Sequence, residues 1–205
     1  MTIGQRTKNF FNGWPYYGEY VNKLNKIEFI VKNYLRKNFC NKRKEYQYAV
    51  IFDIDDTLVY TDGAKVAQNW ISYYEAKYKN MIFPPIWQMI RLAKYAKEKC
   101  GLKVIIITAR PEQSYNASVQ NLKLLGIEWD DMYHTGSQQK KIELKRTLSN
   151  YPYGYNFVLS IGDQWPDLMG LNNYLCIKLP QARDNDINSI FTFTPDVKGS
   201  KYIIK

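Results

Sequence analysis

One stretch of the sequence, residues 48–60, constrains the fold more than any other. It begins with a short apolar run over residues 49–52 and then turns abruptly acidic at Asp53, Asp55 and Asp56. An unbroken apolar run of this length predicts a strand that is buried on both faces of a parallel sheet. Open α/β sheets bind ligands at the carboxyl ends of their strands, so we expect the acidic residues to lie at such a site.

The two aspartates Asp53 and Asp55 are two positions apart, so their side chains point to the same side if the extended conformation continues. Two close carboxylates repel each other, and a hard cation such as Mg²⁺ relieves that repulsion. The alternative is a strand that ends in a solvated acidic turn, with Asp56 or Thr57 capping the next helix. For an isolated pair of aspartates this second interpretation is the more common one.

The rest of the chain alternates apolar runs with stretches of helical periodicity, which predicts an α/β protein with a central parallel sheet. We expect strands at residues 102–110, 131–136, 157–161 and 174–179, and helices at residues 19–39, 64–79, 86–99, 111–125 and 138–148. Thr108 ends one of these strands, and Asp163 and Asp167 follow another. These side chains are expected at the same sheet edge as Asp53, where the carboxylates would complete an oxygen-ligand cage.

The composition is that of an ordinary globular protein, with 205 residues, enough for one domain with a proper core. No apolar run approaches the roughly 18–20 residues that span a bilayer, and the N-terminus has no apolar signal segment. The three cysteines Cys40, Cys100 and Cys176 are widely spaced and odd in number. They predict free thiols in a reducing compartment, with no disulfide framework or zinc site. We therefore expect an intracellular, cytoplasmic protein that is not bound to a membrane.

The net charge of +10 favours anionic partners, namely phosphorylated small molecules, nucleic acid or an anionic membrane surface. The charge alone selects none of these. The predicted helix at residues 19–39 carries basic residues such as Lys23, Lys26 and Arg36 away from its apolar face. This pattern fits either a nucleic-acid patch or a solvated basic face.

Two stretches resemble specific motifs of the haloacid dehalogenase-like (HAD) phosphohydrolases. Asp-x-Asp-x-Thr at residues 53–57, directly after an apolar strand, is similar to motif I of that superfamily. Gly-Asp-Gln-Trp-Pro-Asp at residues 162–167 is similar to motif IV, in the form seen in plant and bacterial acid phosphatases. Taken together, the two motifs favour a phosphohydrolase over an acidic surface turn.

Two further stretches lie between these motifs in the expected order. Thr-Ala-Arg-Pro-Glu at residues 108–112 resembles motif II of the acid phosphatase subgroup, with Ala109 where glycine is usual. Thr108 alone could instead cap a helix, and Arg110 could face the phosphate or pair with a carboxylate. Motif III requires a lysine, for which Lys141 and Lys140 compete. Lys141 fits the family spacing Lys-x-x-x-Arg, although lysine stands at position 145.

The resemblance covers residues 19–179 and identifies the chain as similar to subfamily IIIB, with the plant vegetative-storage-type and bacterial class C acid phosphatases. It implies a Rossmann-like three-layer sandwich with a central parallel sheet, an N-terminal helix and a small helical insertion after motif I. We expect one domain over residues 1–205, with an N-terminal arm and helix at 1–46, the insertion at 61–100 and a tail at 181–205.

The activity implied by the resemblance is Mg²⁺-dependent hydrolysis of a phosphomonoester, on a small phosphorylated metabolite or nucleotide. It makes Asp53 the nucleophile and Asp55 the general acid and base. The remaining implied roles are phosphate binding by Thr108, Ala109, Arg110 and Lys141, and metal binding by Asp53, Asp55 (through its backbone carbonyl), Asp163 and, through a metal-bound water, Asp167. The alternatives are a nucleic-acid end-processing phosphatase, a phosphotransferase and a catalytically silent binding or storage protein.

Overall fold

The computed structural model describes residues 17–40, 47–61, 83–150, 152–171 and 174–181, together with the backbone of residues 190–192 and 202–203. The expected N-terminal arm, the predicted helix at residues 64–79 and most of the tail after residue 181 lie outside these ranges.

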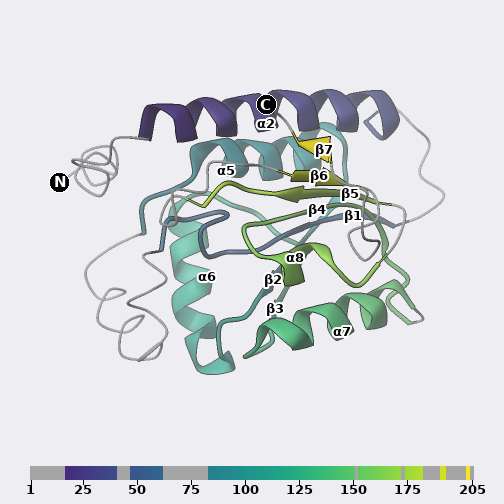
Figure 1. Ribbon diagram of the computed structural model, residues 1–205. Coiled ribbons are helices and arrows are strands. Elements are labelled where there is room, and N and C mark those ends of the chain that lie inside the picture. Colours follow the sequence, from purple (N-terminus) through teal and green to yellow (C-terminus); the bar gives the residue numbers. More distant parts are fainter. Residues whose placement is uncertain are drawn as a thin grey trace.

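In the described part of the chain, a twisted seven-stranded sheet forms the centre, in the order β3-β2-β1-β4-β5-β6-β7 (Figure 1). Its strands are β1 (Tyr48–Phe52), β2 (Lys103–Thr108), β3 (Asp131–His134), β4 (Asn156–Gly162), β5 (Leu175–Lys178), β6 (Ile190–Thr192) and β7 (Tyr202–Ile203). Neighbours among β1 to β5 pair in parallel, which confirms the predicted parallel sheet. The strands β6 and β7 extend the sheet in antiparallel pairs. The motif I strand β1 therefore lies between β2 and β4, in the middle of the parallel part.

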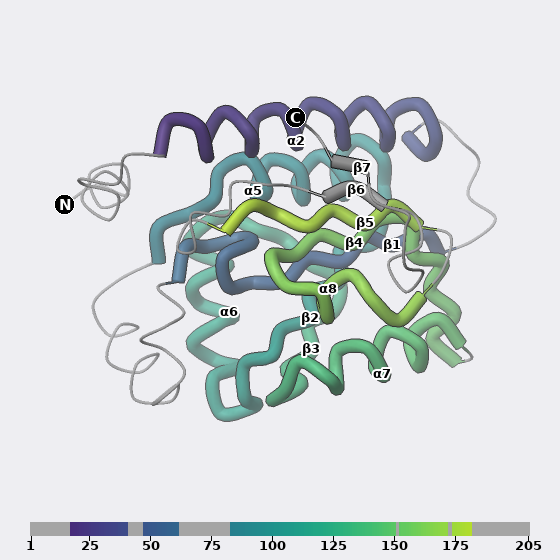
Figure 2. Tube along the Cα trace, in the orientation of Figure 1, coloured from purple at the N-terminus to yellow at the C-terminus, as the bar shows by residue number. Residues whose placement is uncertain are grey.

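Helices cover both faces of this sheet, as the three-layer prediction requires. The helical segments are α2 (Tyr17–Asn38), α5 (Trp87–Lys94), the π-helical turn η1 (Tyr95–Lys99), the 3-10 turn η2 (Glu112–Ser114), α6 (Tyr115–Leu124), α7 (Gln138–Ser149) and α8 (Trp165–Leu168). The helices α2 and α5 stack on one face and α7 covers the other (Figures 1 and 2). Among the described helices, none is both long enough and apolar enough to cross a membrane.

Alternation along β1 explains why the strand is apolar throughout. Val50 and Phe52 belong to the larger core cluster, which contains the apolar face of α2. Ala49 and Ile51 belong to a second cluster, which Leu148 of α7 completes. Each face of the strand is thus covered by a helix. The apolar surface buried in this way stabilises both layers by about 25 cal/mol per Å².

The residues on either side of positions 62–82 are hydrogen-bonded to each other. The Tyr60 amide donates a hydrogen bond of 2.8 Å to the Pro84 carbonyl, and the Ile86 amide donates one of 2.9 Å to the Leu58 carbonyl. The later part of the predicted insertion then forms α5 and η1, which pack under α2 (Figure 1). This part of the chain therefore belongs to the layer that covers the sheet.

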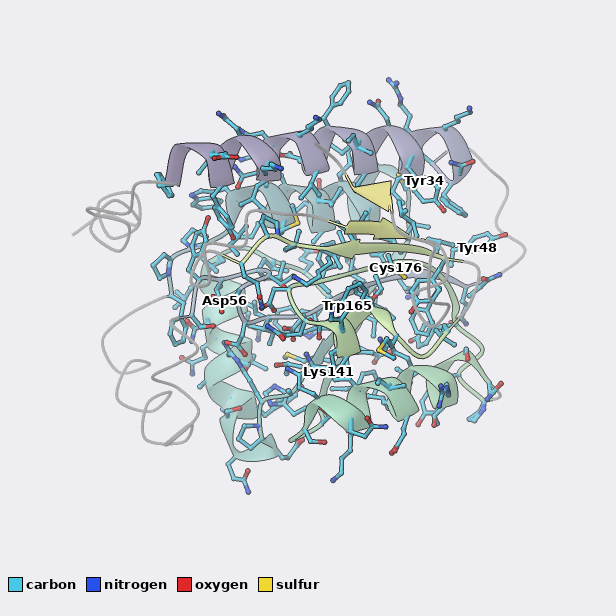
Figure 3. All side chains as sticks on the ribbon, in the orientation of Figure 1. Tyr34, Tyr48, Asp56, Lys141, Trp165 and Cys176 are labelled. Carbon is cyan, nitrogen blue, oxygen red and sulfur yellow. A yellow bond between two sulfur atoms is a disulfide. The ribbon has the colours of Figure 1, made fainter. Side chains whose placement is uncertain are left out.

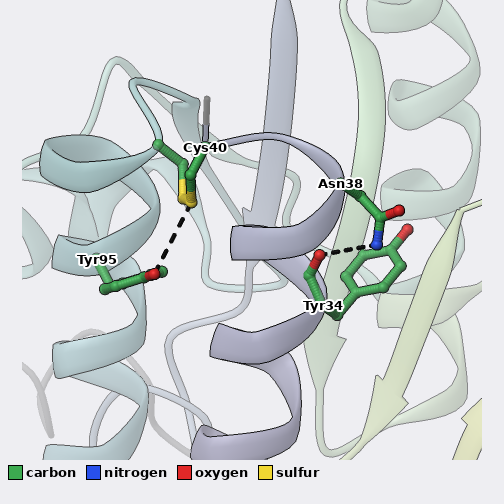
Figure 4. The surroundings of a disulfide bond; sticks show 5 residues. Tyr34, Asn38, Cys40 and Tyr95 are labelled. Carbon is green, nitrogen blue, oxygen red and sulfur yellow. Dashed lines mark hydrogen bonds between the residues drawn. A yellow bond between two sulfur atoms is a disulfide. The ribbon is translucent and has the colours of Figure 1, made fainter. Parts of the chain in front are cut away.

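The cysteine prediction is wrong for two of the three residues. Cys40 and Cys100 form a disulfide that joins the chain after α2 to the turn between η1 and β2 (Figure 4). Cys176 is a buried thiol outside this disulfide. The Tyr95 hydroxyl lies 3.9 Å from Cys40 Sγ, and the Asn38 side chain donates to a carbonyl of the last turn of α2. The paired cysteines are 60 positions apart in sequence, so only the packing of α2 on α5 and η1 brings them together.

Candidate active site

The predicted site residues meet at the carboxyl edge of the parallel strands. Asp53 directly follows β1, Thr108 ends β2, and Asp163 directly follows β4. The parallel pairing of β1 with β2 and with β4 brings these three strand ends side by side. The site is therefore built by the topology expected for an open α/β sheet.

A buried lysine joins two of the carboxylates. Lys141 Nζ donates hydrogen bonds of 2.8 Å to Asp53 Oδ1 and 2.6 Å to Asp167 Oδ1, and its side chain is only 1 % exposed. Figure 3 shows Lys141 reaching from α7 towards the sheet. Its neighbour Lys140 is exposed, and its amide donates to the helix-capping hydroxyl of Ser137. Of the two lysines that competed for motif III, Lys141 is thus the one that contacts the carboxylates.

The charges in this cluster perturb one another strongly. Burial raises the pKa of the Asp53 carboxyl well above its ordinary value, and the Lys141 ammonium offsets this only in part. Burial and the nearby Asp167 carboxylate raise the pKa of Asp163 to about 6. Burial alone would lower the pKa of Lys141, but Asp167 and Asp53 outweigh it and raise that pKa. Negative charge therefore accumulates here beyond what one lysine neutralises.

Three of the carboxylates form a group that could hold a metal ion. Oxygen atoms of Asp53, Asp163 and Asp167 all lie within 4.8 Å of one another, and the three residues are buried. Asp163 Oδ2 is held by the side-chain amides of Gln164 and Gln181, at 2.8 and 3.0 Å. An all-oxygen donor set with excess negative charge suits a hard divalent cation.

Asp55, the remaining aspartate among the predicted site residues, lies in a different ion pair. Its two carboxylate oxygens accept hydrogen bonds from Arg110, at 2.8 Å from Nε and 2.7 Å from Nη2. Thr108 is fully buried, and its hydroxyl accepts a bond of 3.2 Å from the Arg110 amide. Ala109 is partly exposed between these two buried residues. Of the two alternatives for Arg110, the carboxylate partner is the contact that the structure contains, and a contact with phosphate stays a prediction.

Several further residues support the site, and the sequence motifs assign them no role. Lys145, 1 % exposed, donates to the carbonyls of Pro166 and Asp167 at 2.8 Å each, and Ser160 donates to the same Asp167 carbonyl at 2.6 Å. These bonds fix the short helix α8 that carries Asp167. Lys145 stands one helical turn after Lys141, so both side chains lie on the same face of α7. This spacing is the sequence signal that places Lys145 near the site. Gln181 had no such signal, because it lies beyond β5 and far from Asp163 in sequence.

Comparison with known proteins gives consistent matches. Residues 2–186 match the family described as HAD superfamily, subfamily IIIB (acid phosphatase). The chain is 28% identical over 145 residues to Acid phosphatase 1 of Solanum lycopersicum, covering 63% of this chain and 56% of the relative. It is 30% identical over 142 residues to Vegetative storage protein 1 of Arabidopsis thaliana, covering 63% of this chain and 52% of that relative.

The aligned regions span about half the length of these curated relatives. Among solved structures, the class C acid phosphatase from Bacillus anthracis superposes with a TM-score of 0.54 at 19% sequence identity, covering 82% of this chain and 72% of that chain. At this identity the likeness concerns the fold, and it agrees with the parallel α/β sheet described above.

Proposed function

Because the chain belongs to the acid phosphatase family of the HAD superfamily (subfamily IIIB), we propose that it hydrolyses phosphate monoesters through a covalent intermediate on Asp53. The observation that carries the proposal is the pairing of Asp53 with a buried lysine. The Asp53 carboxylate lies 2.8 Å from Lys141 Nζ at the carboxyl end of the central strand, where α/β sheets bind ligands.

In the first step, an Asp53 oxygen attacks phosphorus in line, and the bond between phosphorus and the leaving oxygen breaks. In its protonated form Asp55 gives its proton to that leaving oxygen, so that an alcohol departs and the Asp55 carboxylate remains. In the second step, a water oxygen attacks the phosphorus of the aspartyl phosphate while Asp55 takes a proton from the water. The bond from Asp53 to phosphorus breaks, and inorganic phosphate and the free carboxylate are released.

Cationic and N–H groups would stabilise the charge on the phosphoryl oxygens. Lys141 is proposed to bind one of them while it remains close to Asp53, which reduces the repulsion between nucleophile and phosphate. The Thr108 hydroxyl and the Ala109 amide are proposed as further donors, because both stand at the end of β2 beside Asp53.

The cation proposed for the carboxylate group is Mg²⁺, which Asp53, Asp163 and the Asp55 backbone carbonyl would hold. Asp167 would hold a metal-bound water, since its two oxygens already accept hydrogen bonds from Lys141 Nζ and the Gln164 amide. The donor set fits, since the clustered oxygens are hard ligands and the raised pKa values of Asp53 and Asp163 reflect crowded, buried negative charge. When bound, Mg²⁺ would neutralise charge shared by the nucleophile and the phosphate.

The proposed substrate is a small phosphorylated metabolite or nucleotide. A nucleic-acid partner would be favoured by the net charge of +10, and the name of the Arabidopsis relative points to storage. The filled positions 53, 55, 141, 163 and 167 support catalysis over storage. The predicted cytoplasmic location loses one support, because the Cys40–Cys100 disulfide is a bond that persists mainly in oxidising compartments.

Hydrolysis of p-nitrophenyl phosphate, with Mg²⁺ and with a chelator, tests the proposal. We expect turnover that requires the cation and is abolished in Asp53→Asn. The control is thermal unfolding of that variant, whose cooperative transition should show that the loss of turnover is not a loss of the fold. A wild type without turnover over pH 5–8, or an Asp53→Asn variant that keeps its activity, would contradict the proposal.

A further inference from the structure

Arg110 is a fully buried cation, 0 % exposed, that forms two hydrogen bonds to Asp55, the proposed general acid and base. Its Nε and Nη2 atoms bind the two oxygens of Asp55 in a parallel, two-point ion pair at 2.8 and 2.7 Å. Such bidentate pairs fix geometry as well as contributing energy, because the planar guanidinium matches the planar carboxylate.

The guanidinium is itself held from other sides. Its Nη1 atom donates a bond of 2.9 Å to the hydroxyl of Ser118, which in turn donates to the Ser114 carbonyl at 3.1 Å. The ring of Phe83 lies 5.7 Å from the guanidinium carbon, within the range of a cation–π contact. Arg110 is therefore braced by α6 and by the segment that follows residue 82.

We propose that Arg110 is a positioning residue, which fixes the Asp55 carboxylate for proton transfer and does not bind the phosphate of the substrate. This inference rests on the proposed phosphatase activity. It assigns one cation to each of the two aspartates that take part in the proposed reaction. Lys141 contacts the nucleophile Asp53, and Arg110 contacts Asp55.

The physical argument concerns rotation of the Asp55 side chain. An aspartate carboxylate turns easily about its last torsion angle, and proton transfer requires an oxygen within hydrogen-bond reach of the leaving group. A lysine at position 110 would keep a positive charge but could not hold both oxygens at once. The arginine is therefore needed for orientation as well as for charge.

The leaving group of the substrate separates this role from phosphate binding. An alkyl phosphate needs its leaving oxygen protonated, whereas p-nitrophenolate departs readily without a proton. For Arg110→Lys we expect kcat/KM for an alkyl phosphate to fall about 10²-fold and that for p-nitrophenyl phosphate less than about 10-fold. The inhibition constant of inorganic phosphate should change less than about twofold, because uniform phosphate binding is retained.

Asp55→Asn and the double variant Asp55→Asn/Arg110→Lys complete the test. If Arg110 acts through Asp55, the double variant should be no slower than Asp55→Asn alone, since residues that act as a unit are non-additive. The matched control is Arg91→Lys, because Arg91 forms a similar two-point pair with Glu28, at 2.9 and 2.5 Å, between α5 and α2. That variant should keep the parent kinetics on both substrates.

A uniform loss on both substrates, together with weaker inhibition by phosphate, would identify Arg110 as a phosphate ligand and overturn the inference. Parent kinetics in a folded Arg110→Lys protein would also overturn it.

If that variant fails to fold, Ser118→Ala replaces it, because it removes one hydrogen bond to the guanidinium and leaves the pair with Asp55. It should show a smaller loss with the same preference for alkyl substrates, and an unselective loss would count against the inference. A wild type without turnover would overturn the proposed function itself, and is recognised without any variant.

Discussion

Lys141 and Asp53 are 88 positions apart in sequence, yet the ammonium of one lies 2.8 Å from the carboxylate of the other. The contact joins α7, on one face of the sheet, to the end of the central strand. Because Lys141 also binds Asp167, a single buried cation holds together carboxylates that follow β1 and β4. Lys141 therefore contributes both to the stability of this sheet edge and to keeping the Asp53 carboxyl ionised.

Lys141→Met is expected to reduce both activity and stability. The variant leaves Asp53 and Asp167 without their cation, which should cost about 3–5 kcal/mol of unfolding free energy, as for other broken buried ion pairs. The lost stabilisation of the phosphoryl oxygens should reduce kcat by about 10²–10³-fold. Urea unfolding and steady-state kinetics measure the two effects.

The control for that prediction is Lys140→Met, at the exposed neighbouring position. It should change the unfolding free energy by less than about 0.5 kcal/mol, as is usual for surface sites, and leave kcat unchanged. Equal unfolding free energies and equal kcat values in the two variants would show that the buried contact of Lys141 contributes to neither stability nor activity.

In the absence of metal, Asp163 should make the protein less stable as the pH rises from about 4 to about 7. Burial and Asp167 raise the pKa of Asp163 from 3.8 to about 6, so over this range the folded state binds more protons than the unfolded state. The contribution of Asp163 to stability is thus present below pH 4 and is lost as the pH passes 6. His134, whose pKa burial lowers, acts in the opposite direction and must be separated from it.

The comparison of wild type with Asp163→Asn makes that separation, because both proteins contain His134. In a chelator, Asp163→Asn should gain stability relative to wild type as the pH rises from 4.5 to 7. Mg²⁺ should stabilise the wild type most at the upper end of the range, where it competes with fewer protons. A stability difference that does not vary with pH would contradict the assigned pKa.

The core elements of this fold could be predicted because their signals are local. The run over residues 49–52 is apolar at every position, and both faces of β1 are buried. The polar residues that end β1, β2 and β4 mark the site, since parallel strands bring such ends together. The strand at residues 190–192 has no comparable local signal, because so short a run does not specify its antiparallel partner β5.

Contacts between distant residues could not be predicted in the same way. Nothing in the sequence near Asp55 indicates that the guanidinium of Arg110 occupies both of its oxygens. The Cys40–Cys100 pair depends on the packing of one helix on another, so cysteine count and spacing pointed to thiols. Side-chain partners across the sheet are set by tertiary packing, which composition and periodicity do not encode.

Gln181 illustrates such a contact, and its role in metal binding can be tested. Its amide donates to Asp163 Oδ2 at 3.0 Å, so it should orient the carboxylate for the cation. For Gln181→Leu we expect Mg²⁺ affinity to fall about 10-fold, the lower end of the range for residues that orient metal ligands. Titration calorimetry and the Mg²⁺-induced rise in melting temperature measure this without turnover. Gln120→Leu, at an exposed position of α6, should bind Mg²⁺ like the wild type, and equal affinities in all three proteins would refute the role.

The Cys40–Cys100 disulfide should stabilise the fold without affecting catalysis. It lies beyond the amino end of β2, whereas the site lies at the carboxyl ends of the strands. Closing a loop of 60 residues in the unfolded chain is expected to contribute about 2–4 kcal/mol, so a reductant should lower the melting temperature. The double variant Cys40→Ser/Cys100→Ser should melt at that lower temperature and gain nothing from oxidation, while keeping the parent kcat.

Thiol labelling measures the disulfide directly. Protein made in an oxidising compartment and then unfolded without reductant should react with an alkylating reagent only at Cys176, and at all three cysteines after reduction. Labelling of all three without reduction would contradict the disulfide and restore the expectation of free thiols. The same measurement on protein taken from its native cell would test the cytoplasmic prediction, because a cytosol normally keeps such pairs reduced.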